Sequence, residues 1–435
     1  MASGPRNSVQ RRSSGQATES RWRISIKLAI FAAAGIWLSW RVLVLGVADV
    51  TERPDPGAAL AWRPAQSTAL AILAAKQFDD AKSAADLAGA EALARRSLAL
   101  QPLQSPAVRV LGLAAALNNQ APRADPLFGL AERISKRDGP VQLWLLDRAL
   151  RMADYPAVVS HADALLRVNP DERRFLIPAL IEASADPRAV APLADHLSAR
   201  PDWRPQFLTR FGAESTDPKT PFLVFQGLKR GPAPATDDEI APYFARLVAA
   251  GLYQDAYRRW SALYAPNRAS SVGQPYDGAF VGLPGPPPFN WILADGEAEL
   301  GGQDDASSRR GLHVTYDASS AHNPARQLVV LSPGDYEVSG DVLFDTPPDA
   351  DQIGWVVKCV AGDEALADVR LTGAPEHRLH FSGRLSVPAS NCAAQWLTLD
   401  TRADGDIEDM SVWFSNLKIT PVGPPANVAH PEAIP

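Results

Sequence analysis

One apolar run near the N-terminus constrains this chain more than any other feature. Residues 28–40 read LAIFAAAGIWLSW without a charge, and after Arg41 the apolar character continues to Ala48. Taken from residue 24 to residue 48, the stretch is long enough as a helix to cross about 30 Å of hydrocarbon. We therefore expect one transmembrane helix over residues 24–48.

The charges before this run set its expected orientation. Residues 1–27 carry a strong basic excess, with Glu19 as the one acidic side chain. By the positive-inside rule the N-terminus is cytoplasmic and the rest of the chain lies outside the cytoplasm. The alternative is a signal peptide cleaved near Gly46 and Ala48, where small residues have a suitable spacing. Arg41, between the apolar run and that site, argues against cleavage.

The length and composition indicate several folded domains. At 435 residues the chain exceeds one ordinary hydrophobic core, and its hydrophobic share of 46% is normal for folded protein. The segment from Asp277 to Lys418 has a strong acidic excess, which repels phosphate backbones and excludes nucleic acid as its partner. Arginine far outnumbers lysine, as in GC-rich bacterial genomes. The expected location is therefore the bacterial inner membrane, single-pass, with the folded domains in the periplasm.

The two cysteines, Cys359 and Cys392, both lie in the C-terminal half of the chain. Outside the cytoplasm an isolated pair of cysteines is typical of one disulfide, and two separate buried thiols are the alternative. Two cysteines by themselves cannot build a structural zinc site.

The middle of the chain, residues 67–268, shows apolar residues at helical spacing with breaks every dozen or so residues. The segments EALARRSLALQP and HADALLRVNP end at Pro102 and Pro170, which are 68 residues apart, or two units of 34. This period, with small residues where helices cross, resembles tetratricopeptide repeats. The resemblance implies an α-solenoid that binds a protein partner along its concave face. An irregular all-α domain is the alternative.

Residues 275–422 have a different pattern, with short runs that alternate between apolar and polar residues. These runs include GLHVTYDA, YEVSGDVLF, GWVVKCVA, HRLHFSGRLSV and SVWFSNLKIT. Turn signals such as Pro-Gly and Asp-Gly separate them. Many short strands without a helical period predict an antiparallel β-sandwich.

The order of these runs carries a second resemblance. GAFVG, PPFNW, LSPGDYEVSGDV and the closing VWFSNLKIT are similar to jelly-roll carbohydrate-binding modules and galactose-binding-like domains. Ser415 stands where those families often have Asp. The resemblance implies a jelly-roll fold and a polysaccharide as the possible partner, although such domains also serve as spacers.

A sugar site needs aromatic faces for stacking and polar side chains for hydroxyl groups. The two rings we predict to contact a ligand are Trp291 and Tyr316. Other aromatic residues of the sandwich are Trp355, Trp396 and Trp413. Alternation places Trp355 on the Cys359 strand, and Trp396 lies near Cys392, so both are expected in the core around the disulfide.

The remaining segments are expected to lack regular structure. They are a disordered cytoplasmic tail (residues 1–23), a Pro-punctuated linker (49–66), a short linker (269–274) and a disordered C-terminal tail (423–435).

No catalytic motif, cofactor fingerprint or metal-ligand pattern is present in the sequence. His377 and His380 are expected on opposite faces of one strand, and the acidic stretch from Asp404 to Asp409 fits no calcium-loop spacing. We therefore expect no catalytic residue, no metal and no cofactor.

Together these features predict a multidomain α and β chain with a transmembrane helix, an α-solenoid and a jelly-roll sandwich. The predicted function is a membrane-anchored, non-catalytic envelope protein that acts as a scaffold in exopolysaccharide or cell-envelope assembly. The alternatives are a purely protein-binding assembly factor and a glycan-modifying enzyme.

Overall fold

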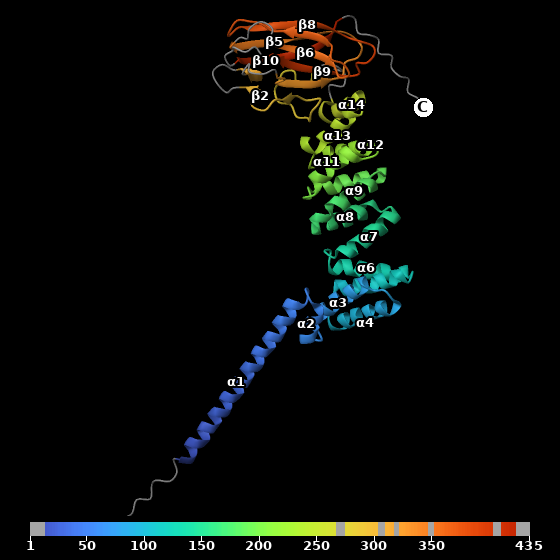
Figure 1. The fold of residues 1–435 in the computed structure, drawn as a ribbon, viewed down its shortest axis with the longest axis vertical. Coiled ribbons are helices and arrows are strands. Elements are labelled where there is room, and N and C mark those ends of the chain that lie inside the picture. The colour runs from blue at the N-terminus through green and yellow to red at the C-terminus, as the bar shows by residue number, and fades with distance from the viewer. Residues whose placement is uncertain are drawn as a thin grey trace, which may run out of the picture. The chain divides into compact units, whose positions relative to one another are not determined.

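The computed structural model describes residues 14–266, 275–302, 309–316, 322–346, 352–402 and 410–422, with side chains from Lys27 onward. Within these ranges helices form the N-terminal part and two antiparallel sheets form the C-terminal part (Figure 1). The chain divides into two compact units, residues 1–152 and 153–435. The linker predicted at 269–274 and the tail predicted at 423–435 lie outside the described residues.

The first unit begins with the long helix α1 (Ser14–Thr51). Its stretch Lys27–Thr51 is long and apolar enough to cross a membrane, with a mean hydropathy of 2.0, a test that signal sequences also pass. The tail predicted to be disordered over residues 1–23 is helical from Ser14. Extending an existing helix costs far less than nucleating one, so polar residues before an apolar helix readily continue it.

The segment predicted as a linker, residues 49–66, holds the end of α1 and a second short helix, α2 (Pro56–Trp62). The Asp55 side chain accepts a hydrogen bond from the Ala58 backbone N–H at 2.9 Å, which caps this helix. Pro56 occupies the first turn, where its missing N–H costs nothing. The prolines that suggested an irregular linker therefore mark the start of a helix.

The other helices of the first unit pack on their neighbours through small residues. They are α3 (Ser67–Asp79), α4 (Ala84–Leu100), α5 (Ser105–Leu117), α6 (Ala121–Ile134) and α7 (Gly139–Met152). Alanines dominate the core between α3, α4 and α5. On α5, a Cβ atom at Gly112 would lie 3.1 Å from the Phe128 ring, so glycine allows α6 to approach closely. The regular 34-residue repeat stays a prediction.

The second unit starts with further helices. They are α8 (Tyr155–Val168), α9 (Arg173–Ala183), α10 (Val190–Leu197), α11 (Arg204–Glu214), α12 (Lys219–Arg230), α13 (Asp237–Ala249) and α14 (Tyr253–Tyr264), with 3-10 turns at Pro170–Glu172 and Pro187–Ala189. A buried ion pair joins α11 to α13: Arg204 donates to both carboxylate oxygens of Glu239 at 3.0 and 2.9 Å. The guanidinium also donates to the carbonyls of Leu197, Ala233 and Pro234, so its donors are satisfied.

Two five-stranded sheets follow, with strand orders β1-β4-β9-β6-β7 and β2-β3-β10-β5-β8. The strands are β1 (Ile292–Leu293), β2 (Ala298–Gly302), β3 (Arg310–Tyr316), β4 (Ala325–Val329), β5 (Gly334–Thr346), β6 (Ile353–Cys359), β7 (Ala365–Arg370), β8 (Arg378–Val387), β9 (Gln395–Thr401) and β10 (Met410–Pro421). The inward side chains of both sheets form one shared core, so the sheets face each other as a sandwich.

A disulfide joins Cys359, at the end of β6, to Cys392, just before β9. The predicted pairing is therefore confirmed. β6 and β9 are also hydrogen-bonded neighbours in the first sheet. The bond thus closes one end of a strand pair in the middle of that sheet.

Helix α14 is fastened to the sandwich through aromatic rings. Trp260 is buried, and its ring centroid lies 4.6 Å from that of Tyr276 and 6.1 Å from that of Phe289. Its indole N–H donates to the Pro286 carbonyl at 3.0 Å. Gln327 on β4 bonds both the N–H and the carbonyl of Tyr276, at 2.8 and 2.9 Å. The segment before β1 is therefore held by the helix on one side and the sheet on the other.

This packing explains why the boundary between the two compact units does not lie near residue 269, where the composition changes. Helices α8 to α14 belong to the same compact unit as the sandwich. The amino-acid pattern marks the change from helices to strands, whereas the units reflect which elements pack together.

The disulfide yields a stability prediction. It spans 33 residues, and closing a loop of that length stabilises the fold by about 3 to 4 kcal/mol. Adding dithiothreitol to the full-length chain in detergent should lower its unfolding free energy by about that amount in urea titrations followed by near-UV circular dichroism. The double variant Cys359→Ala, Cys392→Ala should not respond to the reductant. An unchanged midpoint in the wild-type chain would contradict the prediction.

The buried ion pair yields a second prediction. Glu239→Gln leaves the Arg204 guanidinium buried without a counter-charge, so we expect a loss of about 3 to 5 kcal/mol in unfolding free energy. The matched control is Glu214→Gln, which removes the charge from the exposed pair with Arg210 and should cost less than about 1 kcal/mol. Urea unfolding of both variants measures the difference. Equal losses would show that burial of the Arg204 pair is without consequence.

Candidate binding site on the sandwich

The two rings predicted to contact a ligand lie in the core. Trp291 is 7% exposed and donates its indole N–H to the Asp277 carbonyl at 3.1 Å. Tyr316 is 2% exposed and donates its hydroxyl to the Arg402 carbonyl at 3.2 Å. On β3, Tyr316 shares its face with Leu312 and Val314, which are core residues. Both predicted ligand contacts are thus structural side chains that offer no open ring face.

Trp413 faces outward from the second sheet but is covered. Its partners on the neighbouring strands are His313 and Leu343, and none of the three belongs to the core between the sheets. The His313 ring stacks on the indole, with centroids 4.2 Å apart and an interplanar angle of 11°. The indole N–H donates to Asp345 at 3.1 Å. With 5% of its surface exposed, Trp413 is a support for this face and no stacking platform.

The outer face of the second sheet, which we call the Trp413 face, is otherwise a polar network. Asp345 accepts from Ser411 and pairs with Arg309 at 2.8 Å. Farther along β5, Asp341 bonds Asn416 at 2.7 Å and His380 at 3.0 Å. Partial burial raises the pKa of Asp341, but these two hydrogen bonds outweigh it and hold the net pKa below the usual value. The side chains of this face thus satisfy one another.

Trp396 is the ring that sequence reasoning placed wrongly in the core. It lies on β9 opposite Leu328 of β4 and Lys358 of β6, and its side chain is half-buried. The core side chains of β9 are Leu397 and Leu399, so the alternation points Trp396 outward. Of the five aromatic residues of the sandwich compared so far, Trp291, Tyr316, Trp355 and Trp413 are buried. Among these five, Trp396 alone is partly exposed.

The misplacement has a simple physical cause. Cys392 lies in the turn before β9, so the alternation along the strand cannot be counted from it. Trp355 and Cys359 lie on the same strand, four residues apart, and Trp355 is fully buried as predicted. The register of β9 against β6 pairs Trp396 with the exposed Lys358, which the sequence does not reveal.

The outer face of the first sheet, which we call the Trp396 face, surrounds that ring with polar groups. The Arg326 guanidinium lies over the indole, 5.0 Å from the ring centroid. Such a cation–π contact orients both side chains. Thr398 and the exposed Lys358 flank the ring on neighbouring positions. The face therefore combines an aromatic surface with hydrogen-bond donors.

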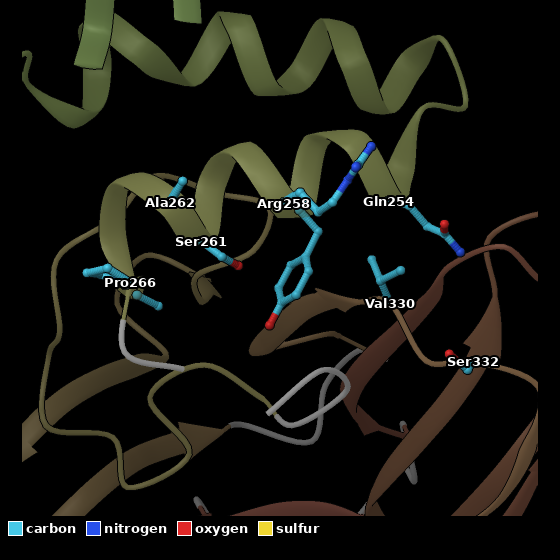
Figure 2. Close-up of a pocket in the computed structure, with 9 residues that line it drawn as sticks. Gln254, Arg258, Ser261, Ala262, Pro266, Val330 and Ser332 are labelled. Atoms are coloured by element: carbon cyan, nitrogen blue, oxygen red, sulfur yellow. The ribbon is translucent and has the colours of Figure 1, made fainter. Parts of the chain in front are cut away.

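A cavity of about 560 Å³ lies where α14 meets the sandwich (Figure 2). One helical stripe of α14 lines it with Gln254, Tyr257, Arg258, Ser261 and Ala262, followed by Ala265 and Pro266 just after the helix. Val330 and Ser332, just after β4, form the opposite wall. Figure 2 shows Ser261 on the helix and Val330 on the sandwich side pointing into this space. The volume suits a small ligand or part of a longer one.

The cavity has one polar group without a partner. The Ser261 hydroxyl oxygen is buried and has no hydrogen-bond partner among the described residues. A buried hydroxyl without a partner costs free energy, so a bound polar group would be favoured there. The opposite stripe of α14, with Ala256, Trp260 and Leu263, is buried, which fixes the rotation of the helix.

The cavity and Trp396 belong to the same face of the sheet. Trp396 stands opposite Leu328, and Val330 follows two residues later along the chain. Leu328 and Val330 also line a smaller space with Tyr257 of α14. Leu328 and Val330 are only 1% and 5% exposed, so the outer side of β4 is covered between the Trp396 ring and the cavity. We take the Trp396 ring and the cavity beside α14 as two separate parts of the candidate binding site.

The structure gives His377 and His380 different surroundings. His380 lies on β8 and bonds Asp341, whereas His377 precedes that strand. Among the described residues no group of three or more His, Cys, Asp or Glu side chains could hold a metal ion. The acidic stretch Asp404 to Asp409 lies outside the described part of the chain.

No protein-family profile and no curated protein sequence matches this chain. Among solved structures, similar ones are carbohydrate-binding modules, matched over the sandwich. One is a family 4 module, described as "CBM4 structure and function", with 13% identity and a TM-score of 0.23, covering 31% of this chain and 86% of that one.

Two further matches are modules with named sugars. The CBM22-2 xylan-binding domain of Xyn10C from Paenibacillus barcinonensis has 18% identity and a TM-score of 0.24, covering 31% of this chain and 92% of that one. TmCBM61, solved with β-1,4-galactotriose, has 14% identity and a TM-score of 0.22, covering 30% and 88%. At these values the similarity carries no argument about what this chain binds.

The placement of the two tryptophans can be tested by stability. Trp355→Ala removes a fully buried ring and should cost about 3 to 5 kcal/mol. Trp396→Ala removes an outward ring and should cost less than about 1.5 kcal/mol, because no core cavity forms. Urea unfolding of both variants measures this. Similar losses would mean that Trp396 packs in the core after all.

Proposed function

We propose that this chain is a membrane-anchored, non-catalytic binding protein whose sandwich takes a polysaccharide on the Trp396 face. The carrying observation is that Trp396, alone of the five aromatic candidates, keeps an accessible ring and has donors around it. Pyranose rings present apolar C–H faces that stack on indoles, and their hydroxyl groups need polar side chains. Arg326, Lys358 and Thr398 supply those groups beside the ring.

The cavity beside α14 is a second part of this site. The space lined by Gln254, Arg258 and Ser261 would take another part of the polysaccharide, because the buried outer side of β4 separates it from the Trp396 ring. The unpartnered Ser261 hydroxyl would meet a sugar hydroxyl there. The proposal rests on this chemistry alone.

The proposed location is the periplasmic side of a bacterial inner membrane. A single apolar helix precedes the folded units, and basic residues dominate before it, which favours a cytoplasmic N-terminus. The disulfide supports an oxidising compartment. An envelope or exopolysaccharide assembly system would use such an anchored binder.

The absence of catalysis is part of the proposal. The carboxylates on the Trp396 face are engaged, since Asp368 and Asp400 pair with Arg370 at 2.6 and 2.7 Å. Arg402 pairs with Asp368 as well, at 3.1 Å. Arginine side chains thus occupy both carboxylates, so the proposal assigns neither of them a role as a glycosidase acid.

The helical region is proposed to bind a protein partner. Large apolar side chains of the first unit are exposed, among them Leu103, Leu117, Leu143 and Met152. Single exposed apolar side chains are common on protein surfaces and do not mark an interface by themselves. A scaffold that binds only proteins stays the second candidate function, on the resemblance of this region to helical repeats.

The test is a binding screen on the full-length chain in nanodiscs. Soluble xylan, β-1,4-galactan, mixed-linkage glucan and bacterial exopolysaccharides serve as probes in affinity electrophoresis and calorimetry. We expect at least one polysaccharide to bind, and Trp396→Ala to weaken it at least tenfold, or about 1.4 kcal/mol.

Phe175→Ala is the matched control, because Phe175 is an exposed ring in the helical region with Arg174 over it at 4.6 Å. It should leave the affinity unchanged. No binding to any polysaccharide by the folded chain would favour the protein-only scaffold. Binding that Trp396→Ala retains would remove the site from the Trp396 face.

A further inference from the structure

Helix α1 changes character part-way along its length. From Lys27 to Leu43 every residue is exposed, whereas from Val44 the helix is partly covered and Ala48 is fully buried. Exposed apolar surface costs about 25 cal/mol per Å² in water, so the bare stretch requires a covering. The covered stretch belongs to the folded unit.

Polar contacts mark the covered stretch as water-facing. The Gln66 amide donates to the carboxylates of Asp49 and Glu52, each at 2.9 Å. Arg63 donates to the Gln66 side-chain oxygen at 2.8 Å. Charged groups of this kind are costly inside hydrocarbon, so the bilayer must end before Asp49.

A cluster of exposed tryptophans lies just before this point. Trp40 of α1 and Trp62 of α2 have ring centroids 6.3 Å apart, and they are 55% and 44% exposed. Trp37, one turn before Trp40, is 60% exposed. The Arg41 guanidinium lies over the Trp37 ring, 5.6 Å from its centroid. Helix α2 therefore folds back along α1 and brings a third indole to the level of the other two.

Trp and Arg at one level are the side chains that membranes place at their surface. Indole rings prefer the headgroup region, where one edge is apolar and the N–H is hydrated. Arginine buries its stem in the apolar layer and keeps its guanidinium among the headgroups. Each of these side chains is exposed in the fold, so each is free to meet lipid.

We propose that α2 rests on the bilayer surface with Trp62 inserted beside Trp40, and that the spanning segment ends near Val44. This inference rests on the anchoring part of the proposed function. It shortens the span predicted at residues 24–48 by about one helical turn. It also makes α2 a membrane-docking element that holds the folded unit against the lipid.

The length of the helix agrees with this placement. Lys27 and Arg41 are fourteen residues apart, which is about 21 Å along the axis. The long stems of both side chains reach outward and make up the remainder of the ~30 Å hydrocarbon thickness. A span that continued to Ala48 would instead draw Arg41 and α2 into the hydrocarbon.

The experiment is fluorescence quenching of the full-length chain in vesicles of phosphatidylcholine and phosphatidylglycerol. Bromine atoms on the upper acyl-chain carbons quench only indoles that reach that depth. We expect the Trp62→Phe variant to lose a measurable part of the quenchable fluorescence. The matched control Trp144→Phe removes an indole of the same unit that stacks on Phe128, and should leave the quenchable fluorescence per chain unchanged.

Two measurements distinguish the docking of α2 from the membrane anchoring by α1. Flotation of the chain with vesicles after alkaline carbonate extraction reports anchoring, whatever Trp62 does. A chain that floats but shows the same quenching loss in Trp62→Phe and Trp144→Phe would overturn the docking of α2 alone. A chain that does not float would overturn both the anchor and this inference.

Discussion

The candidate site depends on the burial of one side chain, Trp260. Its ring lies between α14 and the aromatic residues Tyr276 and Phe289, and its N–H is satisfied by a carbonyl of the segment that leads into the sandwich. At Gly285, a Cβ atom would lie 2.7 Å from this ring, so only glycine permits the approach. Because the ring fixes the rotation of α14, the opposite stripe of that helix lines the cavity over β4. Burial and the nearby Asp237 carboxylate raise the pKa of the Tyr264 hydroxyl on the same helix. This hydroxyl therefore stays neutral.

Each outer face of the sandwich carries one outward tryptophan, and the two faces cover that ring differently. On the Trp413 face, His313 covers the indole and Asp345 takes its N–H, so the ring is closed to a ligand. On the Trp396 face, the ring is only partly covered, by an arginine whose guanidinium can turn away at small cost. A ligand can compete with the second arrangement far more easily than with the first. This difference, more than the number of aromatic residues, favours the Trp396 face for binding.

In the proposed placement, the membrane anchor and the folded unit share helix α1. Its bare stretch and its covered stretch form one continuous helix, so forces on the folded unit would pass directly into the membrane span. The amide of Gln66 joins the end of α1 to the turn before α3, which makes the junction stiff.

The sequence alone determined the apolar helix, the helical middle, the sandwich and the disulfide, because each depends on local periodicity or on a residue count. It also placed Trp355 in the core, since Cys359 lies on the same strand and the alternation can be counted between them. It failed for Trp396, Trp291 and Tyr316. The outward direction of Trp396 depends on the register between β9 and β6, and the burial of Trp291 depends on the segment that leads into β1. A local sequence pattern predicts neither of these. The prolines at residues 54–56 looked like a linker because a helix start and a loop use the same residues. Only the tertiary structure decided which tryptophan is accessible and where α14 leaves a cavity, because both follow from contacts between segments far apart in the chain.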